Sequence, residues 1–549
     1  MLVFCARAMA APTAQPFLDR ARAMGLAQSV GWQHLLHYRP DTSGGVMSEV
    51  DGQGFFLSST GRHDSEAELE ATLRAFLMPL HEGQEDAHAL CRFPARRLWL
   101  DGQLHFEGSL HRPTCPLLDR YVTALDPDAI AVVYSAPYLG NAVSAFGHTF
   151  MRIRKRRPAG AAESSERLDY GVDFIGIPDT KNPLLYVYGG LAGTFPGVVR
   201  FHSYEYKMGE YAHEGRDLWE YDLALTHEEV TLLSLHLFEL SATHMNFSYL
   251  RNNCSYGILS IVEAGVPRID LISRLDAVVV PKDTIRALVS VPGLVRAVGY
   301  RPSPQSVRRA DTSPPMPLPA DKAPDLAPGS MRFTMGNGAT TQYRSEFVAV
   351  GYRLVFHDLA DPPDGSSELS QVQFLDAQMR YDVGRGTLAL DHITFADLVS
   401  LDPLTRFHKP LSWKVSAFAM RPHDRACPDC LAQGLEGGVG ATVASDGERV
   451  ALFLMADAYA EASSSLEGVD RSFVRIGVGP YVGVRVHLPG QVVGLLTGSW
   501  SYLPGSTLVD TYDLRAALRC ALARDVALGV EAAVQPLSTE ALLTSYLYF

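Results

Sequence analysis

Cys254 is the residue of this 549-residue chain whose surroundings most favour nucleophilic chemistry. It follows two asparagines in RNNCSYGILSIVEAG, and an apolar, helix-like run begins directly after it. A thiolate is the reactive form of cysteine, and its pKa falls at a helix N-terminus or beside an imidazole. The helix dipole favours an anion there, and the backbone N–H groups could serve an oxyanion. The sequence therefore predicts a thiol nucleophile at the head of a helix.

A nucleophile of this kind needs a base on another element, and His148 is the best candidate. It lies in NAVSAFGHTFMRI, where the alternation after the glycine predicts a strand. A third residue should orient the imidazole. The segment LDYGVDF is the predicted hairpin partner of that strand, and it offers Asp173 and Asp169. We favour Asp173, because its two apolar neighbours indicate burial, and Tyr170 is the further alternative.

These residues also have ordinary structural interpretations. A buried cysteine is most often a small hydrophobic residue, and a histidine on a strand is more often core or surface than catalytic. The same region contains other histidines that could be paired with Cys254, namely His202, His213, His236 and His244. The pairing of Cys254 with His148 is therefore a hypothesis at this stage.

Polar and aromatic residues near the nucleophile predict the substrate contacts. The three residues before it are Arg251, Asn252 and Asn253. They either hold a phosphate group, orient the loop or cap the helix. The Gly- and Tyr-rich stretch 186–221 is either a mobile loop over the site or a packed connection. In the first case Tyr204 and Tyr211 would contact a lipid and its head group.

Three segments carry a resemblance to a known family. They are FGHTFMRI, GRDLWEYDLALTHEE and HLFELSATHMNFSYLRNNCSYGILSIVE. In this order they resemble the Lnb family of bacterial lipoprotein N-acyltransferases, through its periplasmic domain, over about 130–270. The resemblance extends more loosely to WQHLLHY, GFFLSSTG and CRFPARRLWL near the N-terminus. The order of His before Cys also looks like permuted NlpC-type and lecithin retinol acyltransferase-like thiol enzymes, which have a permuted papain-like fold.

The resemblance implies that Cys254 is the nucleophile and His148 the base, and it leaves the third residue open. It implies transfer of a fatty acyl group from a phospholipid, through a Cys254 thioester, to an amine such as a lipoprotein N-terminus. Water as the acceptor would make the site a lipase or thioesterase, and an amide substrate would make it an amidase or peptidase. The third hypothesis is a non-enzymatic outer-membrane barrel with a periplasmic binding domain. None of these interpretations calls for a cofactor or a metal.

Residues 331–549 differ in character, because the helical period disappears and segments of roughly ten residues alternate between turn residues. In RVALFLMADAYAE one face is apolar and the other carries Asp457 and Glu461. Charges inside and apolar residues outside are typical of a membrane barrel. The chain also ends on an aromatic residue, Phe549. We expect an antiparallel outer-membrane barrel of roughly 10–12 strands, with a soluble β-sandwich as the alternative.

The whole-chain numbers fit several domains. The chain is too long for a single core, and a formal charge of −13 does not favour nucleic acid as a partner. We expect α+β domains followed by an all-β barrel. The expected segments are a signal-peptide remnant (1–15), a mixed α/β accessory domain (16–125), a Cys–His catalytic α+β domain (126–300), a Pro-rich linker (301–330) and the barrel (331–549). The expected location is the periplasm, anchored in the outer membrane.

Cysteine usage fits an oxidising compartment. CPDC predicts a small disulfide and not a zinc site, because no second CxxC motif exists. The expected pairs are Cys91–Cys115 and Cys427–Cys430, which leaves Cys254 and Cys520 as free thiols. In the accessory domain, GQGFFLSSTG and ARRLWLDGQ predict short strands around a helix at SEAELEATLRAFL. Thr226 and Glu229 form a capping-box pattern that predicts the start of a second helix.

Overall fold

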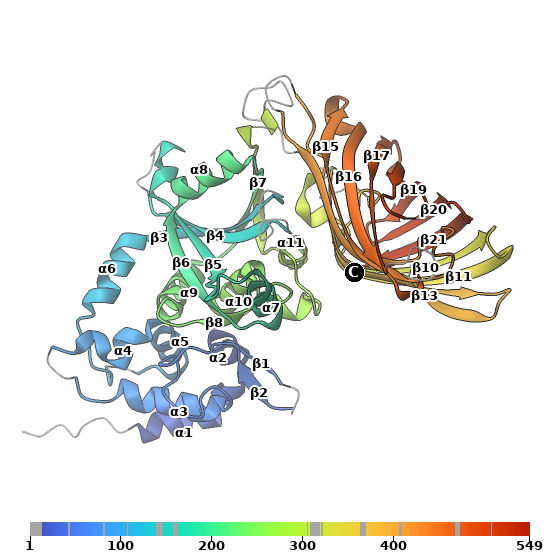
Figure 1. The fold of residues 1–549 in the computed structure, drawn as a ribbon. Coiled ribbons are helices and arrows are strands. Elements are labelled where there is room, and N and C mark those ends of the chain that lie inside the picture. The colour runs from blue at the N-terminus through green and yellow to red at the C-terminus, as the bar shows by residue number, and fades with distance from the viewer. Residues whose placement is uncertain are drawn as a thin grey trace, which may run out of the picture. The chain divides into compact units, whose positions relative to one another are not determined.

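The computed structural model of the chain describes residues 14–41, 44–80, 83–106, 108–138, 146–157, 163–304, 306–307, 319, 322–362, 369–405, 409–466, 473–506 and 508–549. Residues 1–13 of the predicted signal-peptide remnant and 308–318 of the predicted linker lie outside this set. Within the described ranges, no helix is long and apolar enough to cross a membrane. Two compact units make up the chain (Figure 1). The first is drawn from Met1–Tyr134, His148–Glu210 and Glu220–Gly299, and the second from Ser135–Gly147, Tyr211–Trp219 and Tyr300–Phe549.

The helices belong to the part of the chain before the barrel. They are α1 Gln15–Ala23, α2 Val30–Leu35, α3 Ser65–Phe76, α4 Ala89–Arg92, α5 Pro94–Leu104, α6 Pro116–Leu125, α7 Pro183–Ala192, α8 Tyr204–Glu214, α9 His227–Leu240, α10 Cys254–Gly265 and α11 Pro281–Val289. The strands there are β1 Tyr38–Pro40, β2 Val46–Ser48, β3 Pro127–Ser135, β4 His148–Lys155, β5 Tyr170–Gly176, β6 Phe195–Ser203, β7 Leu218–Leu223, β8 Met245–Phe247 and β9 Val295–Arg301.

A seven-stranded sheet organises these elements in the order β8-β6-β5-β4-β3-β7-β9. Strand β5 lies between β4 and β6 and pairs antiparallel with both. Helix α8 lies on one face of the sheet, and α9 and α10 lie on the other (Figure 1). Helix α9 begins as its capping box predicts, with Thr226 Oγ1 accepting from Glu229 N and the Glu229 carboxylate accepting from Thr226 N. Helix α10 is buried along most of its length and packs on α9, α11, β4 and β5.

The predicted accessory block packs against the sheet-bearing part of the first unit. Buried Arg96 donates to the Glu68 carboxylate, with 2.8 Å between Nη1 and Oε1. Glu239, on α9, accepts the backbone N–H of Ala95 and of Arg96, at 2.7 and 3.0 Å. The Glu239 carboxylate of α9 thus joins the accessory block to the sheet-bearing part, whereas the Arg96–Glu68 pair lies within the block itself.

Two strand predictions in this block are wrong. ARRLWLDGQ lies in α5, where Pro94 occupies the first turn, a position that suits proline because its missing N–H is not needed there. GQGFFLSSTG forms turns and bends and has no strand. The helix predicted between them is α3, capped by the Asp64 side chain.

The cysteines pair as predicted. Disulfides join Cys91 to Cys115 and Cys427 to Cys430. Cys254 and Cys520 are free and partly exposed. The two thiols therefore serve as matched probes, one at the predicted nucleophile and one in the barrel.

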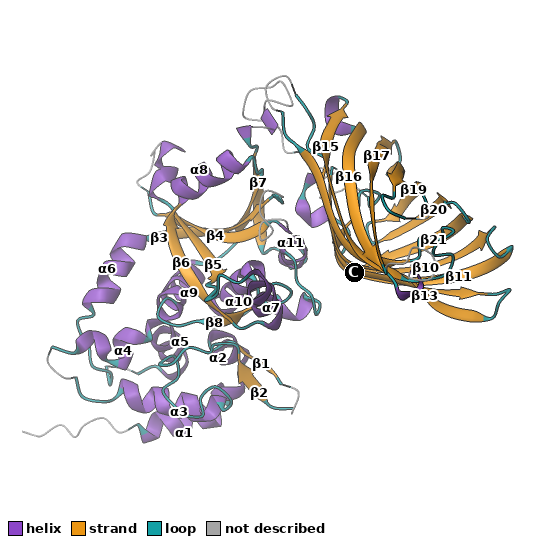
Figure 2. Ribbon diagram, in the orientation of Figure 1, coloured by secondary structure: helices purple, strands orange, loops and turns teal. Residues whose placement is uncertain are grey.

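The second unit contains a closed antiparallel barrel of twelve strands (Figure 2). Its strands are β10 Arg332–Thr340, β11 Ser345–His357, β12 Ser370–Asp382, β13 Thr387–Ser400, β14 Ser412–Met420, β15 Ala432–Ala444, β16 Val450–Ala462, β17 Val474–Leu488, β18 Val492–Tyr502, β19 Asp510–Ala523, β20 Val526–Val534 and β21 Thr539–Tyr548. Exposure alternates along β16, where Leu452 is 48% exposed while Asp457 and Glu461 are buried. Apolar residues therefore face outward and charges face the lumen, as a membrane barrel requires.

The barrel closes by pairing its first strand with its last. Strand β10 pairs antiparallel with β21, and Met331 and Phe549 exchange backbone hydrogen bonds of 3.1 and 3.0 Å. A Cβ at Gly329 would lie 2.4 Å from the backbone of Phe549, so only glycine fits beside the terminal residue. We call the end where β10 begins and β21 ends the near end, and the opposite end the far end.

Candidate functional site

Helix α10 begins at Cys254 because Asn253 caps it. Asn253 Oδ1 accepts hydrogen bonds from the backbone N–H groups of Ser255 and Tyr256, at 3.1 and 3.2 Å, as asparagine commonly does at an N-cap. The backbone N–H of Cys254 itself has no hydrogen-bond partner among the described residues. This donor therefore remains available to an oxyanion that forms next to the partly exposed thiol.

His148 and Asp173 project from the same face of the sheet. The register pairs Arg152 of β4 with Gly171 of β5. Side chains two residues apart on a strand point the same way, so His148 and Asp173 both lie on the Arg152 side. His148 Nε2 is 3.2 Å from Asp173 Oδ1. His148 is the first residue of β4, and the Cys254 thiol lies within hydrogen-bonding reach of it. The structure thus brings the three predicted catalytic residues together.

The three groups influence one another's charge. Burial raises the pKa of Cys254, but the charge and hydrogen bond of His148 and the N–H of Thr149 outweigh burial and lower the pKa below that of an ordinary cysteine. Burial lowers the pKa of His148, but Cys254 and Asp173 raise it to about 9. Burial opposes the ionisation of Asp173, but His148 and Lys207 hold its pKa well below its usual range. The arrangement favours a thiolate–imidazolium pair beside a carboxylate.

Sequence reasoning missed Lys207 and gave His202 no role. Lys207 Nζ lies 2.8 Å from Asp173 Oδ2, and His202 Nε2 lies 3.2 Å from the same oxygen. The register explains His202, because it pairs with Gly171 and so shares the face of Asp173. Lys207 reaches the carboxylate from α8 and is almost fully buried. The periodicity of β6 could have placed His202, whereas no local signal indicates that α8 folds back over Asp173.

The alternative third residues are placed elsewhere. Asp169 Oδ2 is 2.7 Å from Arg152 Nη2, and its Oδ1 is 2.9 Å from Arg157 Nη2. Tyr170 pairs with Ile153 and projects from the opposite face to Asp173. Asp173 is therefore the one of the three that lies against His148. In the described part of the chain, no group of three or more His, Cys, Asp or Glu side chains is arranged to hold a metal ion.

The polar residues before the nucleophile differ in what they do. Asn253 uses its whole amide as a cap, because Nδ2 also donates to the carbonyls of Tyr249 and Val279, at 3.2 and 2.6 Å. It has no capacity left for a phosphate, so the capping alternative describes it. Asn252 Oδ1 is buried without a partner among the described residues, and the side chain of Arg251 is exposed. Substrate contact by these two remains a prediction.

The Gly- and Tyr-rich stretch is not a mobile loop, because it consists of α7, β6, α8 and the start of β7. Tyr204 is fully buried, and its hydroxyl donates to the Glu220 carboxylate. Tyr211 is 2% exposed, with the Arg216 guanidinium 4.8 Å from its ring centre. Neither ring is placed to touch a lipid, so the predicted substrate contacts of these tyrosines are not supported. Their aromatic character serves packing and ion pairs instead.

Helix α7 presents an apolar stripe that the sequence analysis did not single out. Leu185, Tyr188 and Leu191 are 55, 67 and 52% exposed. They recur every third residue on a helix without charged side chains in its first or last turn. The helix is joined to the approach to the nucleophile, because Gly190 O accepts the N–H of Tyr249 at 2.8 Å. Exposed apolar residues gathered in this way usually mark a contact surface.

Comparisons with protein families cover most of the chain in three pieces. Residues 118–291 match the Lnb N-terminal periplasmic domain. Residues 24–103 and 321–548 match two domains of unknown function, DUF7843 and DUF7840. The first match contains Cys254, His148 and Asp173, and the last spans the barrel. No curated protein matches the sequence.

Solved structures similar to this chain are outer-membrane barrels. The KdgM porin in complex with disordered oligogalacturonate is 7% identical, with a TM-score of 0.24, and the match covers 40% of this chain and 99% of the porin. The COG4313 outer membrane channel from Pseudomonas putida F1 is 13% identical, with a TM-score of 0.25, and the match covers 43% of this chain and 100% of the channel. At these scores the similarity carries nothing about function.

The location follows from the parts of the chain. One segment matches a periplasmic domain, and another forms a closed, even-stranded antiparallel barrel with apolar residues outside. Such barrels span the bacterial outer membrane. The protein therefore resides in the periplasm and is anchored in the outer membrane by a twelve-stranded barrel.

Proposed function

We propose that this protein is a cysteine-dependent acyltransferase of the bacterial envelope. It moves a fatty acyl group from a phospholipid, through a thioester on Cys254, to an amine such as the N-terminus of a lipoprotein. The observation that carries the proposal is the contact of Cys254 with His148 and of His148 with Asp173, within a segment that matches the Lnb N-terminal periplasmic domain. In this proposal the three residues act as a permuted papain-like site.

Acylation begins from the thiolate–imidazolium pair. The Cys254 sulfur attacks the ester carbonyl carbon of the phospholipid and forms a C–S bond. The negative charge on the carbonyl oxygen is stabilised by the backbone N–H of Cys254, at the positive end of α10. The C–O bond then breaks, and the lysophospholipid oxygen takes the proton from His148. Asp173 orients the imidazole and stabilises its charged form.

Transfer reverses these roles. The acceptor amine attacks the thioester carbonyl, and a C–N bond forms while the C–S bond breaks. His148 receives the proton that the amine loses, which restores the thiolate–imidazolium pair. An amine wins over water only if the acceptor is held close to the thioester and water is kept away.

A lipid donor suits the surroundings of the site. The exposed Leu185, Tyr188 and Leu191 on α7 supply an apolar surface joined to the segment that leads to Cys254. The barrel places the same chain in a lipid bilayer. The exposed Arg251 lies three residues before the nucleophile, where a phosphate group could meet it. These features favour a phospholipid over a peptide as the acyl donor.

The proposal is tested by intact-mass spectrometry of the full-length protein after mixing with a diacyl phospholipid. We expect an added fatty-acyl mass on the wild type that hydroxylamine removes, together with lysophospholipid as the second product. A diacylglyceryl-cysteine peptide with a free N-terminus is then added, and the acyl group should move to it. The same peptide with an acetylated N-terminus is the matched control and should remain unmodified.

Other outcomes separate the alternatives. Free fatty acid without acylated peptide would make the protein a lipase and overturn the transferase assignment. If the acyl-enzyme adduct, lysophospholipid and free fatty acid were all absent, the lipid chemistry would be overturned altogether. Cleavage of cell-wall peptides by the same sample would then favour the amidase.

A further inference from the structure

The connection between β14 and β15, residues 421–431, is a far-end loop of the barrel. The twelve strands leave five other connections at the far end, because every second turn lies there. This loop touches all five. It accepts hydrogen bonds from Gln342 Nε2 to Pro428 O (2.8 Å), from Arg385 Nη1 to Asp429 Oδ2 (3.2 Å) and from Leu537 N to His423 O (3.1 Å). Its apolar residues pack with Leu466 and Leu508.

These partners lie around the whole rim of the barrel. They come from the connections β10–β11, β12–β13, β16–β17, β18–β19 and β20–β21. A loop of 421–431 can approach every one of them within contact distance only if it crosses the opening that they surround. The far-end mouth is therefore covered from the inside by one segment of chain.

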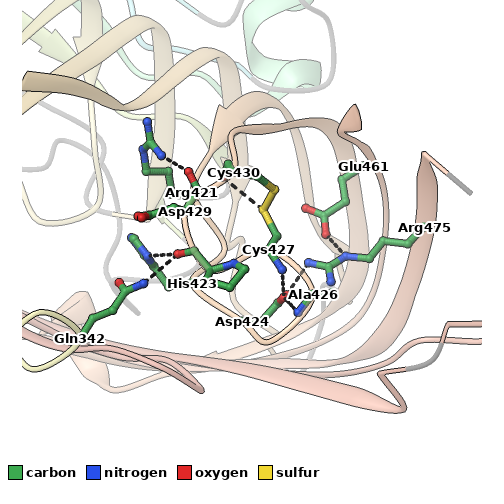
Figure 3. The surroundings of a disulfide bond; sticks show 11 residues. Gln342, Arg421, His423, Asp424, Ala426, Cys427, Asp429, Cys430, Glu461 and Arg475 are labelled. Atoms are coloured by element: carbon green, nitrogen blue, oxygen red, sulfur yellow. Dashed lines mark hydrogen bonds and ion pairs between the residues drawn. A yellow bond between two sulfur atoms is a disulfide. The ribbon is translucent and has the colours of Figure 1, made fainter. Parts of the chain in front are cut away.

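Burial and charge show that the loop is seated within the mouth. Asp424 and Cys427 are fully buried although both belong to a surface connection. The Asp424 carboxylate pairs with Arg475 of β17, which also pairs with Glu461 of β16 (Figure 3). Asp424 Oδ1 accepts the N–H groups of Ala426 and Cys427, at 2.9 and 2.8 Å. The Cys427–Cys430 disulfide then holds the tip of the loop in this compact form.

The described start of a second connection, residues 358–362, is drawn into the near end. The segment after β11 places Asp358 and Asp361 among arginines from three strands. The distances are 3.3 Å from Arg332 Nη1 to Asp361 Oδ1, 2.6 Å from Arg353 Nη1 to Asp361 Oδ2 and 3.0 Å from Arg519 Nη1 to Asp358 Oδ1. The Tyr548 hydroxyl of β21 donates to Asp361 at 2.7 Å. Arg485 of β17 donates to the carbonyl of Leu359 at 2.9 Å. Leu359 also packs in one buried cluster with Val399 of β13 and Phe453 of β16, so the contacts of this segment reach strands on several sides of the barrel.

We infer that the barrel is closed by its own loops at both ends and serves as a membrane anchor, not as a channel for solutes. The near end carries the chain that leads from the periplasmic domain, so the far end faces the outside. The ion pairs that hold the two loops are buried, and breaking such a pair would leave a charge uncompensated. Each loop is therefore held firmly in place, and an ion entering the lumen would meet a closed end from either side.

The test is ion conductance of the full-length protein in planar phospholipid bilayers, with dye-loaded vesicles of the same lipid as a second readout. The wild type should give no stepwise conductance and release no small dye. Replacing residues 424–430 by a Gly-Ser pair removes the far-end seal. Asp358→Asn with Asp361→Asn releases the near-end loop. Either change alone should leave the barrel closed, whereas the combined variant should conduct.

Two results would overturn the inference. One is steady conductance or dye release by the wild type, and the other is a combined variant that folds and remains silent. Folding is checked by heat-dependent gel migration, which reports an intact barrel. If the combined variant does not fold, the wild-type measurement decides alone, because a sealed barrel and an open one differ there. The inference does not depend on the acyltransferase proposal.

Discussion

Two clusters in this molecule each pair buried carboxylates with positively charged side chains, but only one of them contains a reactive group. The site cluster consists of Cys254, His148, Asp173 and Lys207, and the near-end cluster consists of Arg332, Arg353, Arg519, Asp358 and Asp361. Both place ionised side chains in contact away from water. In the near-end cluster the three arginines and Asp361 are buried, and Asp358 is partly buried.

The difference is access. In the site cluster one member, the Cys254 thiol, is partly exposed and is a strong nucleophile when ionised. In the near-end cluster both carboxylates are paired with arginine guanidinium groups, which stay charged and do not act as nucleophiles. Burial of charge is therefore a weak guide to chemistry by itself. What marks the candidate site is a reactive atom at the open edge of a charge network.

The largest expected effect is at Cys254. Cys254→Ala should abolish the acyl-enzyme and lower turnover about a thousandfold or more, because it removes the proposed nucleophile. Cys520→Ala is the matched control, since it removes the other free thiol among the described residues, and its turnover should equal that of the wild type. Initial rates of lysophospholipid release measure both. Activity retained in Cys254→Ala would place the chemistry elsewhere.

The second effect concerns the orienting carboxylate. Asp173→Asn should lower the acylation rate about a hundredfold or more, because the imidazolium loses its partner. The pH dependence of the acylation rate should also change in this variant. The imidazolium that protonates the leaving group is lost as pH rises through the pKa of His148, at about 9. Because Asp173 raises that pKa, the alkaline limb should move to lower pH in the variant. A limb that stays in place would show that Asp173 does not act on His148.

The near-end cluster should respond in stability and not in chemistry. Asp361→Ala should lower the free energy of unfolding of the barrel by about 3–5 kcal/mol, because it leaves buried arginines without their carboxylate partner. Asp429→Ala is the control, since its pair with Arg385 is exposed on both sides and should contribute about 0–1 kcal/mol. Urea titrations followed by gel migration measure both. Acyl-enzyme formation should be unchanged in each, and a loss of chemistry in Asp361→Ala would contradict the comparison.

Lys207 tests whether the site cluster extends to α8. Lys207→Met should reduce the acylation rate about tenfold, the usual scale for a residue that holds a functional group in place. Lys207→Arg keeps the charge and should recover most of the rate. The affinity for the donor should not change, because Lys207 is buried and contacts Asp173. An effect on affinity alone would mean that Lys207 meets the lipid.

The smallest effect is expected on α7. The combined change Leu185→Ser, Tyr188→Ser and Leu191→Ser should raise the KM for a long-chain phospholipid about tenfold, equivalent to about 1.4 kcal/mol. A water-soluble short-chain ester should react as with the wild type, since its chain is too short to use the stripe. Equal loss for both substrates would assign the stripe to folding.

Much of the architecture could be predicted because its signals are local. The capping box of Thr226 and Glu229 gave the start of α9, and strict alternation in β16 gave the barrel and its polar lumen. The strand prediction for α5 is wrong because an apolar run of that length fits either period, and Pro94 in the first turn favours a helix start. The sequence also pointed to Cys254, His148 and Asp173, which lie on a helix start and two adjacent strands.

The remaining parts of the site depend on tertiary contacts. Lys207 meets Asp173 only because α8 covers one face of the sheet, and nothing in the spacing of the two residues indicates this. Tyr204 and Tyr211 were expected at a lipid surface because tyrosine is common there, yet their partners are Glu220 and Arg216. A side chain with both apolar and polar parts suits an interior ion network equally well.

The seam between β10 and β21 sets an order of events during biogenesis. The strand that opens the barrel, β10, pairs with the last barrel strand, β21, so the barrel cannot close until β21 has been made. The sheet around Cys254 draws on residues that emerge much earlier and can fold while the rest is still being exported. The domain that contains Cys254 therefore folds before the barrel inserts into the membrane. Cells that lack a working outer-membrane assembly pathway should accumulate the protein with this domain folded and the barrel not inserted.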